Sequence, residues 1–170
     1  GCDDVEISGV SQDSRTVEPG DLFLAWCGSK WDAPDFVASA ASAGAAAAVV
    51  DSKVTNVAIP QICVSDGRRA AALAADRVFG SPWRNLFTVG VTGTNGKTTT
   101  VLLIRHLLNS DGSAAALGTL GLVEPDGQLR KGTEDLTTPG PVKMSEWLHD
   151  LAAEGVSSVA LEASSHALEQ

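Results

Sequence analysis

The stretch Gly90-Val91-Thr92-Gly93-Thr94-Asn95-Gly96-Lys97-Thr98-Thr99-Thr100 decides the fold of this chain. An apolar run over 86–91 predicts a strand before it, and a helix is predicted over 97–109. A glycine-rich turn between a strand and a helix is typical of a phosphate-binding loop, because glycine lets successive backbone N–H groups point at an anion. Lys97 then supplies positive charge to the phosphates, and the Thr98 hydroxyl can bind Mg²⁺.

One position departs from the strict pattern G-x-x-x-x-G-K-[ST], because Val91 stands where that pattern has its first glycine. The alternative interpretation is an ordinary glycine-rich turn before a lysine that starts a helix. The flanking strand and helix favour the phosphate loop, and the displaced glycine points away from the general P-loop GTPases.

Strands and helices alternate on both sides of the loop, which predicts an α/β fold with a mostly parallel sheet and helices on its faces. Ser81 to Asn85 looks like a junction between two parts. Before the junction, strands are predicted over 22–25, 46–50 and 62–64, with helices over 34–43 and 67–79, and Asp66 is predicted to cap the second of these helices. After the loop, the predicted elements are a strand over 114–117, a hairpin or loop over 118–135, a helix from Thr138 and Pro139 to Ala153, and a strand over 156–161.

Composition narrows the class of protein. Of the 170 residues 44% are hydrophobic and 19% are charged, and the net charge of −9 comes without a Lys/Arg cluster, which excludes a nucleic-acid surface. The longest apolar stretch, Ala43 to Val50, is too short to span a membrane, and the first residues do not resemble a signal peptide. Three scattered cysteines without a CxxC pair argue against a disulfide scaffold or a zinc site. We therefore expect a cytoplasmic monomer that acts on small molecules.

Three blocks of the sequence stand out together. They are Gln12-Asp13-Ser14-Arg15 with Pro19-Gly20-Asp21-Leu22-Phe23, then Thr92-Gly93-Thr94-Asn95-Gly96-Lys97-Thr98-Thr99, and last Thr137-Thr138-Pro139 with Glu162-Ala163-Ser164-Ser165-His166-Ala167-Leu168. In these blocks the sequence resembles the Mur ligase family. The Thr-Thr-Pro and Ser-Ser-His elements favour the member that adds the third amino acid over the later ligase that adds D-alanyl-D-alanine.

This resemblance implies an ATP- and Mg²⁺-dependent amide ligase of peptidoglycan synthesis. It would join meso-diaminopimelate or L-lysine to UDP-N-acetylmuramoyl-L-alanyl-D-glutamate through an acyl phosphate. Residues 1–83 would be the UDP-substrate-binding domain, and residues 84–170 the first part of the central ATP-binding domain. Because a parallel sheet of so few strands leaves apolar faces uncovered, we expect a fragment of a longer protein that is inactive by itself.

The resemblance also implies roles for individual residues. Lys97, Glu162 and His166 would be catalytic, and Thr98 and Glu162 would hold the metal. The ATP-binding residues would be Gly93, Thr94, Asn95, Gly96, Lys97, Thr98 and Thr99. The substrate-binding residues would be Gln12, Ser14, Ser29, Lys30, Trp31, Thr137, Thr138, Ser164 and Gln170.

Several of these residues have a purely structural alternative. Glu162 follows an apolar strand, at the end where ligands collect in parallel sheets, but it could be a solvated loop charge. Thr138 is suited to cap a helix that begins at Pro139, and a helix N-terminus also binds anions. His166 could be an ordinary hydrogen-bonding residue. The family commonly has Asp-Gly-His where this chain has Asp32-Ala33-Pro34, so local contacts there can differ.

Two other functions stay open from the sequence. One is a related ligase, either another Mur enzyme or a folylpolyglutamate synthetase-like ligase. The other is a non-catalytic module that binds a nucleotide or a UDP-sugar. A substrate panel separates the ligases from one another, and ligand titration separates an enzyme from a binding module.

Overall fold

The computed structural model describes residues 4–25, 34–110, 112–132 and 137–169. The chain divides into two compact units, Gly1–Gly80 and Ser81–Gln170. Each unit is a sheet with helices packed on it. No helix in the described ranges has both the length and the apolar character needed to cross a bilayer.

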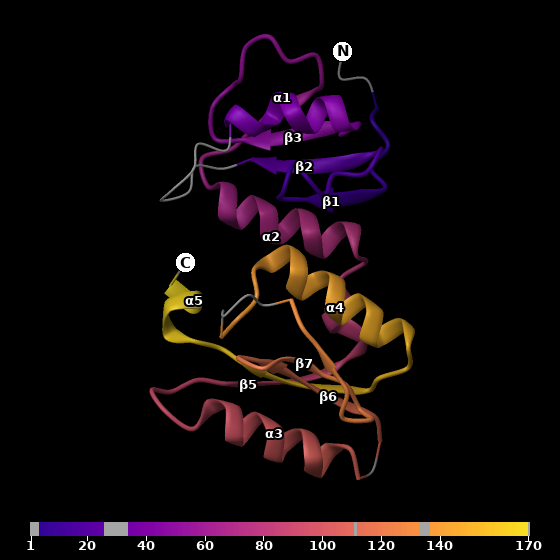
Figure 1. Cartoon of the computed structure of the whole chain (residues 1–170), viewed down its shortest axis with the longest axis vertical. Coiled ribbons are helices and arrows are strands. Elements are labelled where there is room, and N and C mark those ends of the chain that lie inside the picture. The colour runs from indigo at the N-terminus through magenta and orange to yellow at the C-terminus, as the bar shows by residue number, and fades with distance from the viewer. Residues whose placement is uncertain (1–3, 26–33, 111, 133–136, 170) are drawn as a thin grey trace. The chain divides into compact units, whose positions relative to one another are not determined.

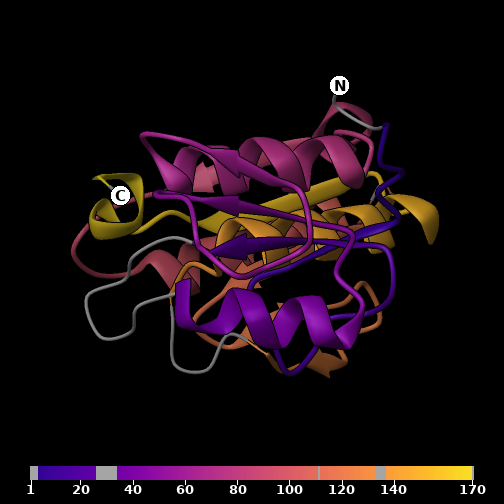
Figure 2. The ribbon, with the colours of Figure 1, turned by 90° about the horizontal axis from the view of Figure 1, so that it is seen from above.

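The first unit has a four-stranded, fully parallel sheet. Its strands lie in the order β1 (Gly9–Ser11), β2 (Asp21–Ala25), β3 (Ala47–Val50) and β4 (Gln61–Cys63). Helix α1 (Pro34–Ala43) packs on β2 and β3 from one side, and α2 (Gly67–Val78) packs on β1, β2 and β3 from the other (Figures 1 and 2).

Burial on both faces explains the apolar runs of this unit. All five residues of β2 and all four of β3 are buried, as expected for parallel strands covered by helices. The core combines Phe23 of β2, Val37 of α1 and Val50 of β3. The predicted cap of α2 is confirmed, because the Asp66 carboxylate accepts a hydrogen bond from the Arg69 backbone N–H at 2.9 Å.

The second unit begins with a short 3₁₀ helix, η1 (Pro82–Asn85), and has a five-stranded mixed sheet. Strands β5 (Phe87–Val91), β9 (Ser158–Glu162) and β6 (Ala114–Gly118) are parallel neighbours in that order. Strands β7 (Gly121–Val123) and β8 (Leu129–Arg130) add antiparallel pairs beside β6. Part of the stretch 118–135, for which a hairpin or loop was expected, thus joins the sheet as β7 and β8, and two of the four strand pairings are parallel while two are antiparallel.

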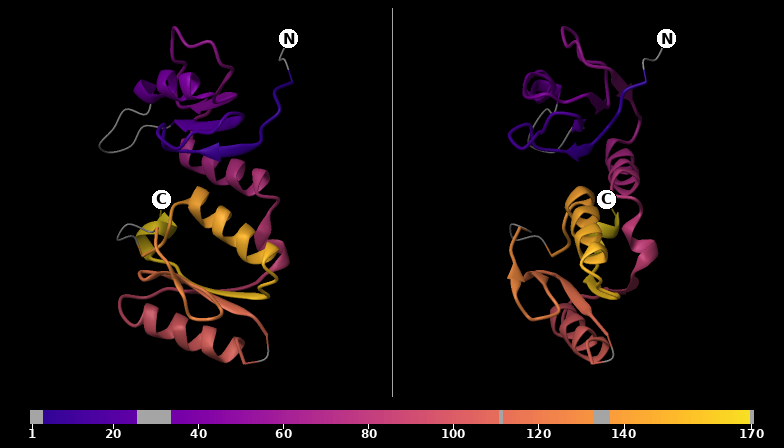
Figure 3. Two further views of the ribbon diagram at one scale, coloured as in Figure 1. Left: turned by 45° about the vertical axis from the view of Figure 1, so that its right-hand side comes forward. Right: turned by 90° about the vertical axis from the view of Figure 1, so that its right-hand side faces the viewer.

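Helices cover both faces of this sheet (Figures 1 and 3). Helix α3 (Lys97–Leu108) lies on one face, where Val101 packs with Ala116 and Ala160. Helix α4 (Pro141–Ala153) lies on the other, where buried Trp147 packs against the sheet. A short helix, α5 (Ser165–Glu169), follows β9. Side chains of β6 and β9 alternate between these two cores, with Ala115 and Val159 in the one beneath α4 and Ala116 and Ala160 in the one beneath α3.

The predicted start of the helix over 138–153 is wrong. Helix α4 begins at Pro141 with Gly140 as its N-cap, so Thr138 is not a capping residue. The reason is a second proline: a residue before proline is pushed away from the helical region, and Gly140 is extended, with φ −62° and ψ 162°. Pro139 therefore cannot be the first residue of the helix, and Thr138 is left to make other contacts.

Candidate functional site

The phosphate loop occupies residues 92–96, between the end of β5 and the start of α3. Gly93 and Gly96 have φ of 143° and 79°, values that favour glycine, and Gly96 is the N-cap of α3. The loop residues are exposed. The first N–H groups of a helix have no acceptor within the helix and carry its positive dipole end. The loop therefore has the geometry of an open anion site.

The Lys97 side chain folds back onto this loop. Its Nζ donates a hydrogen bond to the Gly93 carbonyl oxygen at 2.9 Å, although Lys97 is the first residue of α3. This contact places the ammonium charge beside the glycine turn. The sequence predicted a lysine that serves a polyphosphate, and the position of Nζ is compatible with that role.

Glu162 lies at the same edge of the sheet as the loop. Strands β5 and β9 pair in parallel with Val91 opposite Glu162, so the carboxylate emerges where the loop begins. Glu162 is only 1% exposed, and its Oε1 accepts a hydrogen bond from the Thr98 hydroxyl at 2.8 Å. The alternative of a solvated loop charge does not hold, because this carboxylate is the last residue of a strand and is buried.

The donor set of this edge fits Mg²⁺. A hydroxyl has one proton and two lone pairs, so Thr98 can donate to Glu162 and still offer an oxygen to a cation. Within the described ranges no group of three or more His, Cys, Asp or Glu side chains gathers as a metal cluster. Mg²⁺ is commonly held by only one or two carboxylates together with phosphates and water. Thr98 and Glu162 match that pattern.

Sequence reasoning missed one residue that contacts Glu162. Thr119, directly after β6, donates its backbone N–H to Glu162 Oε1 at 3.0 Å and its hydroxyl to Oε2 at 3.3 Å. The only available signal was the Gly118-Thr119-Leu120-Gly121 stretch, which the sequence alone marks as no more than a turn. A contact between residues so far apart in the chain becomes visible only when β6 and β9 are known to be neighbours.

Gly118 provides the space that Glu162 occupies. A β-carbon at Gly118 would lie 2.2 Å from Glu162 Oε1 and 2.6 Å from its Cδ. We expect Gly118→Ala to destabilise the 170-residue chain by about 1–3 kcal/mol, as overpacked sites do, in urea unfolding followed by circular dichroism. Gly90→Ala is the control, because its β-carbon would meet only a Leu161 methyl at 3.9 Å. Equal stability of the two variants would contradict the packing.

The two parts of the third block of family resemblance meet at Glu162. The Thr138 hydroxyl donates to the Glu162 backbone oxygen at 3.0 Å and accepts from the Ser164 N–H at 3.1 Å. The Ser164 hydroxyl in turn accepts from the Ala167 N–H at 3.1 Å, at the start of α5. Thr138 makes these hydrogen bonds instead of capping α4. They bring Thr138 and Ser164, two of the predicted substrate residues, to the same sheet edge as the predicted metal ligands. Thr137 is adjacent in the chain.

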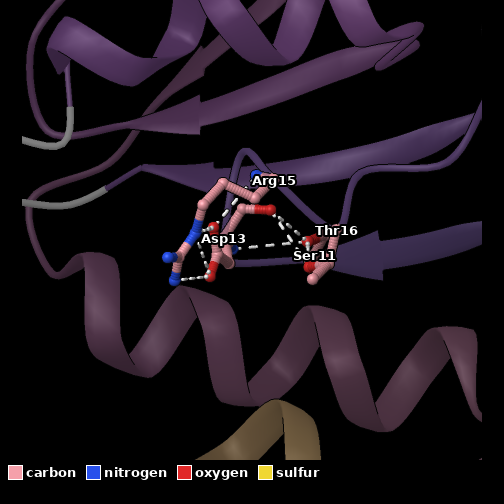
Figure 4. Close-up of polar contacts among 4 residues, drawn as sticks. All are labelled: Ser11, Asp13, Arg15 and Thr16. Atoms are coloured by element: carbon pink, nitrogen blue, oxygen red, sulfur yellow. Dashed lines mark hydrogen bonds and ion pairs between the residues drawn. The ribbon is translucent and has the colours of Figure 1, made fainter.

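The other predicted substrate residues lie in the first unit or outside the described ranges. Gln12 is exposed and Ser14 half-buried, in the turn that follows β1. Figure 4 shows this turn, in which the Ser11 hydroxyl donates to the Asp13 carbonyl oxygen at 3.0 Å and also contacts Thr16. His166 is in α5, but its side chain is not among the described ones. The residues outside the described ranges are Ser29, Lys30, Trp31 and Gln170.

An ion pair inside the same turn lowers the pKa of Asp13. The Arg15 guanidinium and the Arg15 backbone N–H both donate to the Asp13 carboxylate, which stabilises its charged form. We expect Arg15→Ala to raise this pKa toward its ordinary value of 3.8 in an NMR titration of the carboxyl carbon. The wild-type stabilisation is present above the unfolded pKa and is lost as pH falls through the lowered one. It is small, because both side chains are more than a third exposed. An unchanged pKa would show that the pair does not persist in solution.

The second unit has the order of a P-loop α/β protein: a strand, a glycine loop, a helix that starts at the loop lysine, and a carboxylate on the neighbouring strand. A model of the Mur ligase family, catalytic domain, matches residues 6–79, and a model of the Mur ligase middle domain matches residues 91–170. The two models together account for most of the chain, which belongs to the Mur ligase family.

Individual relatives agree with this placement. The chain is 44% identical over 167 residues to UDP-N-acetylmuramoyl-L-alanyl-D-glutamate--2,6-diaminopimelate ligase of Bradyrhizobium diazoefficiens, covering 98% of this chain and 33% of that protein. It is 42% identical over 168 residues to UDP-N-acetylmuramyl-tripeptide synthetase of Deinococcus radiodurans, covering 97% and 34%. A solved UDP-N-acetylmuramoyl-L-alanyl-D-glutamate--2,6-diaminopimelate ligase superposes with a TM-score of 0.75 at 29% identity, covering 96% of this chain and 33% of that one. The chain thus spans about a third of the length of its relatives.

Proposed function

We propose that the full-length protein containing this chain is an ATP-dependent ligase that adds the third amino acid to UDP-N-acetylmuramoyl-L-alanyl-D-glutamate in peptidoglycan synthesis. The observation that carries the proposal is the hydrogen bond between Thr98, in the first turn of the helix that follows the phosphate loop, and the buried Glu162. It joins two family motifs that are 64 residues apart at one edge of a sheet. The identity to third-residue ligases over almost the whole chain supports this member of the family.

The proposed reaction has two steps. The terminal carboxylate of the substrate attacks the γ-phosphorus of ATP, which forms an acyl phosphate and releases ADP. The amine of the diamino acid then attacks the acyl carbon, forms the amide and releases phosphate. The protein contributes orientation of the reactants and neutralisation of phosphate charge. In neither step does a protein side chain form a covalent bond with a reactant.

Each part of the described site has a role in this scheme. The loop N–H groups and Lys97 would bind the β- and γ-phosphates. Thr98 and Glu162 would hold Mg²⁺, which neutralises charge on the transferred phosphoryl group when it is bound. Thr138 and Ser164, beside Glu162, would contact the substrate, together with Thr137. His166 and Gln170 keep their predicted roles as proposals.

The two parts of the chain have different roles in this proposal. Residues 1–83 would bind the UDP part of the substrate, with Gln12, Ser14 and the 29–31 segment in contact with it. Residues 84–170 would begin the ATP-binding domain. We place the full-length protein in the cytoplasm, where ATP and UDP-linked precursors are found, as a monomer without nucleic-acid or membrane partners.

The test is a substrate panel on the full-length protein. With ATP, Mg²⁺ and UDP-N-acetylmuramoyl-L-alanyl-D-glutamate, we expect a tripeptide product by mass spectrometry with either meso-diaminopimelate or L-lysine, together with ADP release. Product formed only with D-alanyl-D-alanine and a tripeptide substrate would identify another Mur ligase. Product formed only with a folate and glutamate would identify the folylpolyglutamate type, and ligand binding without any product would identify a binding module.

A further inference from the structure

The hairpin between β6 and β7 has a short turn with a glycine at each end. Gly118 pairs with Gly121, so the turn between the strands contains only Thr119 and Leu120. Gly121 has φ of 101°, and a β-carbon there would lie 2.7 Å from the Arg130 carbonyl oxygen of the neighbouring β8. A glycine at each end of the turn therefore fixes where Thr119 lies.

Neighbouring strands bring this turn to Glu162. Strands β6 and β9 are parallel, with Leu117 opposite Leu161. The residues that follow these two, Gly118 and Glu162, therefore also lie side by side. Gly118 has no side chain, and the Glu162 side chain crosses the space that a β-carbon would fill. Thr119 follows directly and meets the carboxylate from beyond the end of β6.

Thr119 contacts both oxygens of that carboxylate. Its backbone N–H donates to Oε1 at 3.0 Å, and its hydroxyl donates to Oε2 at 3.3 Å. Thr98, in the first turn of α3, donates to Oε1 alone, at 2.8 Å. Among the hydrogen bonds described for Glu162, the Thr119 hydroxyl is therefore the contact that restrains Oε2. The last torsion of a glutamate side chain is broad, so a carboxylate with one free oxygen can rotate.

We propose that Thr119 is a positioning residue of the metal site, whose hydroxyl fixes the plane of the Glu162 carboxylate. The inference rests on the proposed function, because it takes Thr98 and Glu162 as the residues that hold the cation. Thr119 acts through Glu162 and does not itself ligate the metal. Partners that orient a metal-binding side chain commonly change metal affinity by 10–100-fold when they are removed.

The experiment compares Thr119→Val, which removes the hydroxyl at nearly constant size, with Thr119→Ser, which keeps it. Binding of Mn²⁺ to the full-length protein in the presence of ADP is measured by electron paramagnetic resonance, and the Mg²⁺ concentration for half-maximal activity is measured at saturating ATP. We expect Thr119→Val to weaken Mn²⁺ binding about tenfold and to raise the Mg²⁺ requirement by the same factor, with activity recovered at high Mg²⁺. Thr119→Ser keeps both values near wild type.

A double-mutant cycle separates positioning from a general packing effect. In a Glu162→Gln background, Thr119→Val is expected to weaken Mn²⁺ binding no further. Thr55→Val, which changes an exposed threonine of the first unit, is the matched control.

If Glu162→Gln shifts Mn²⁺ binding and Thr119→Val does not, or if the Thr119→Val effect persists in the double variant, the positioning role is wrong and the proposed function stands. If Glu162→Gln itself leaves Mn²⁺ binding unchanged, the metal site of the proposed function fails. Thermal melting of each variant checks folding, and Thr119→Ala takes the place of Thr119→Val if the latter does not fold.

Discussion

Replacing Lys97 by alanine in the full-length protein is expected to reduce amide formation at least a hundredfold, which corresponds to about 2.7 kcal/mol of transition-state stabilisation. Lys97 places its ammonium 2.9 Å from the Gly93 carbonyl oxygen, directly over the glycine turn. Negative charge on the transferred phosphoryl group is neutralised by fixed positive groups, and this electrostatic contribution is commonly the largest in such reactions. The measurement is kcat/KM for ATP-dependent formation of the tripeptide product.

Two further variants make the Lys97 result specific. Lys53→Ala removes an exposed lysine of the first unit and is expected to leave the rate unchanged. Lys97→Arg keeps the positive charge in a larger, planar group and is expected to restore only part of the activity, because a guanidinium does not fit a site built for a compact ammonium. Near-normal turnover by Lys97→Ala would remove this residue from the phosphate site.

Glu162→Gln keeps the size of the side chain and removes its charge, and we expect it to raise the Mg²⁺ concentration for half-maximal activity at least tenfold. A neutral amide oxygen is a weaker ligand for a hard divalent cation than a carboxylate. The amide oxygen can still accept from Thr98 and from the Thr119 N–H at the place of Oε1, but an NH2 group replaces Oε2, so the Thr119 hydroxyl would have to accept there and could no longer donate. The measurement is activity as a function of Mg²⁺ at saturating ATP.

The control for this prediction is Glu18→Gln, an exposed carboxylate of the first unit with no proposed role. It removes the same charge from the protein, so a shared effect would indicate a change in net charge and not in a metal site. An unchanged Mg²⁺ dependence in Glu162→Gln would leave the buried carboxylate with a structural role only.

Much of the architecture could be predicted because it is encoded locally. Apolar runs bounded by glycine marked the buried strands β2 and β3, and Asp66 marked the start of α2. The phosphate loop was recognisable because its glycines, lysine and threonine lie within one short stretch. Glu162 could be placed at the correct edge because the ends of parallel strands meet there.

The contacts of Thr138 and Thr119 could not be predicted, because they are made with residues distant in sequence. Thr138 had the residue type and the position of a helix cap, but the chain turns it toward Glu162 and Ser164 instead. Gly140 before Pro141 was a local signal that the helix starts later, and the pattern around Thr138 obscured it. Thr119 carried no signal of its own, because its importance comes from a carboxylate 43 residues further along the chain.

The strand order of the second sheet has a consequence for how this protein is made. Of the five strands described in this sheet, β9 is the last along the chain, yet it lies between β5 and β6. Until residues 158–162 have left the ribosome, β5 and β6 have no partner between them, and each presents unpaired backbone groups along that side. A nascent chain in this state is open to pairing with other chains. The insertion of β9 closes that gap, and the same event brings Glu162 to Thr98, so the pairing of β5 and β6 with β9 and the formation of this contact occur together.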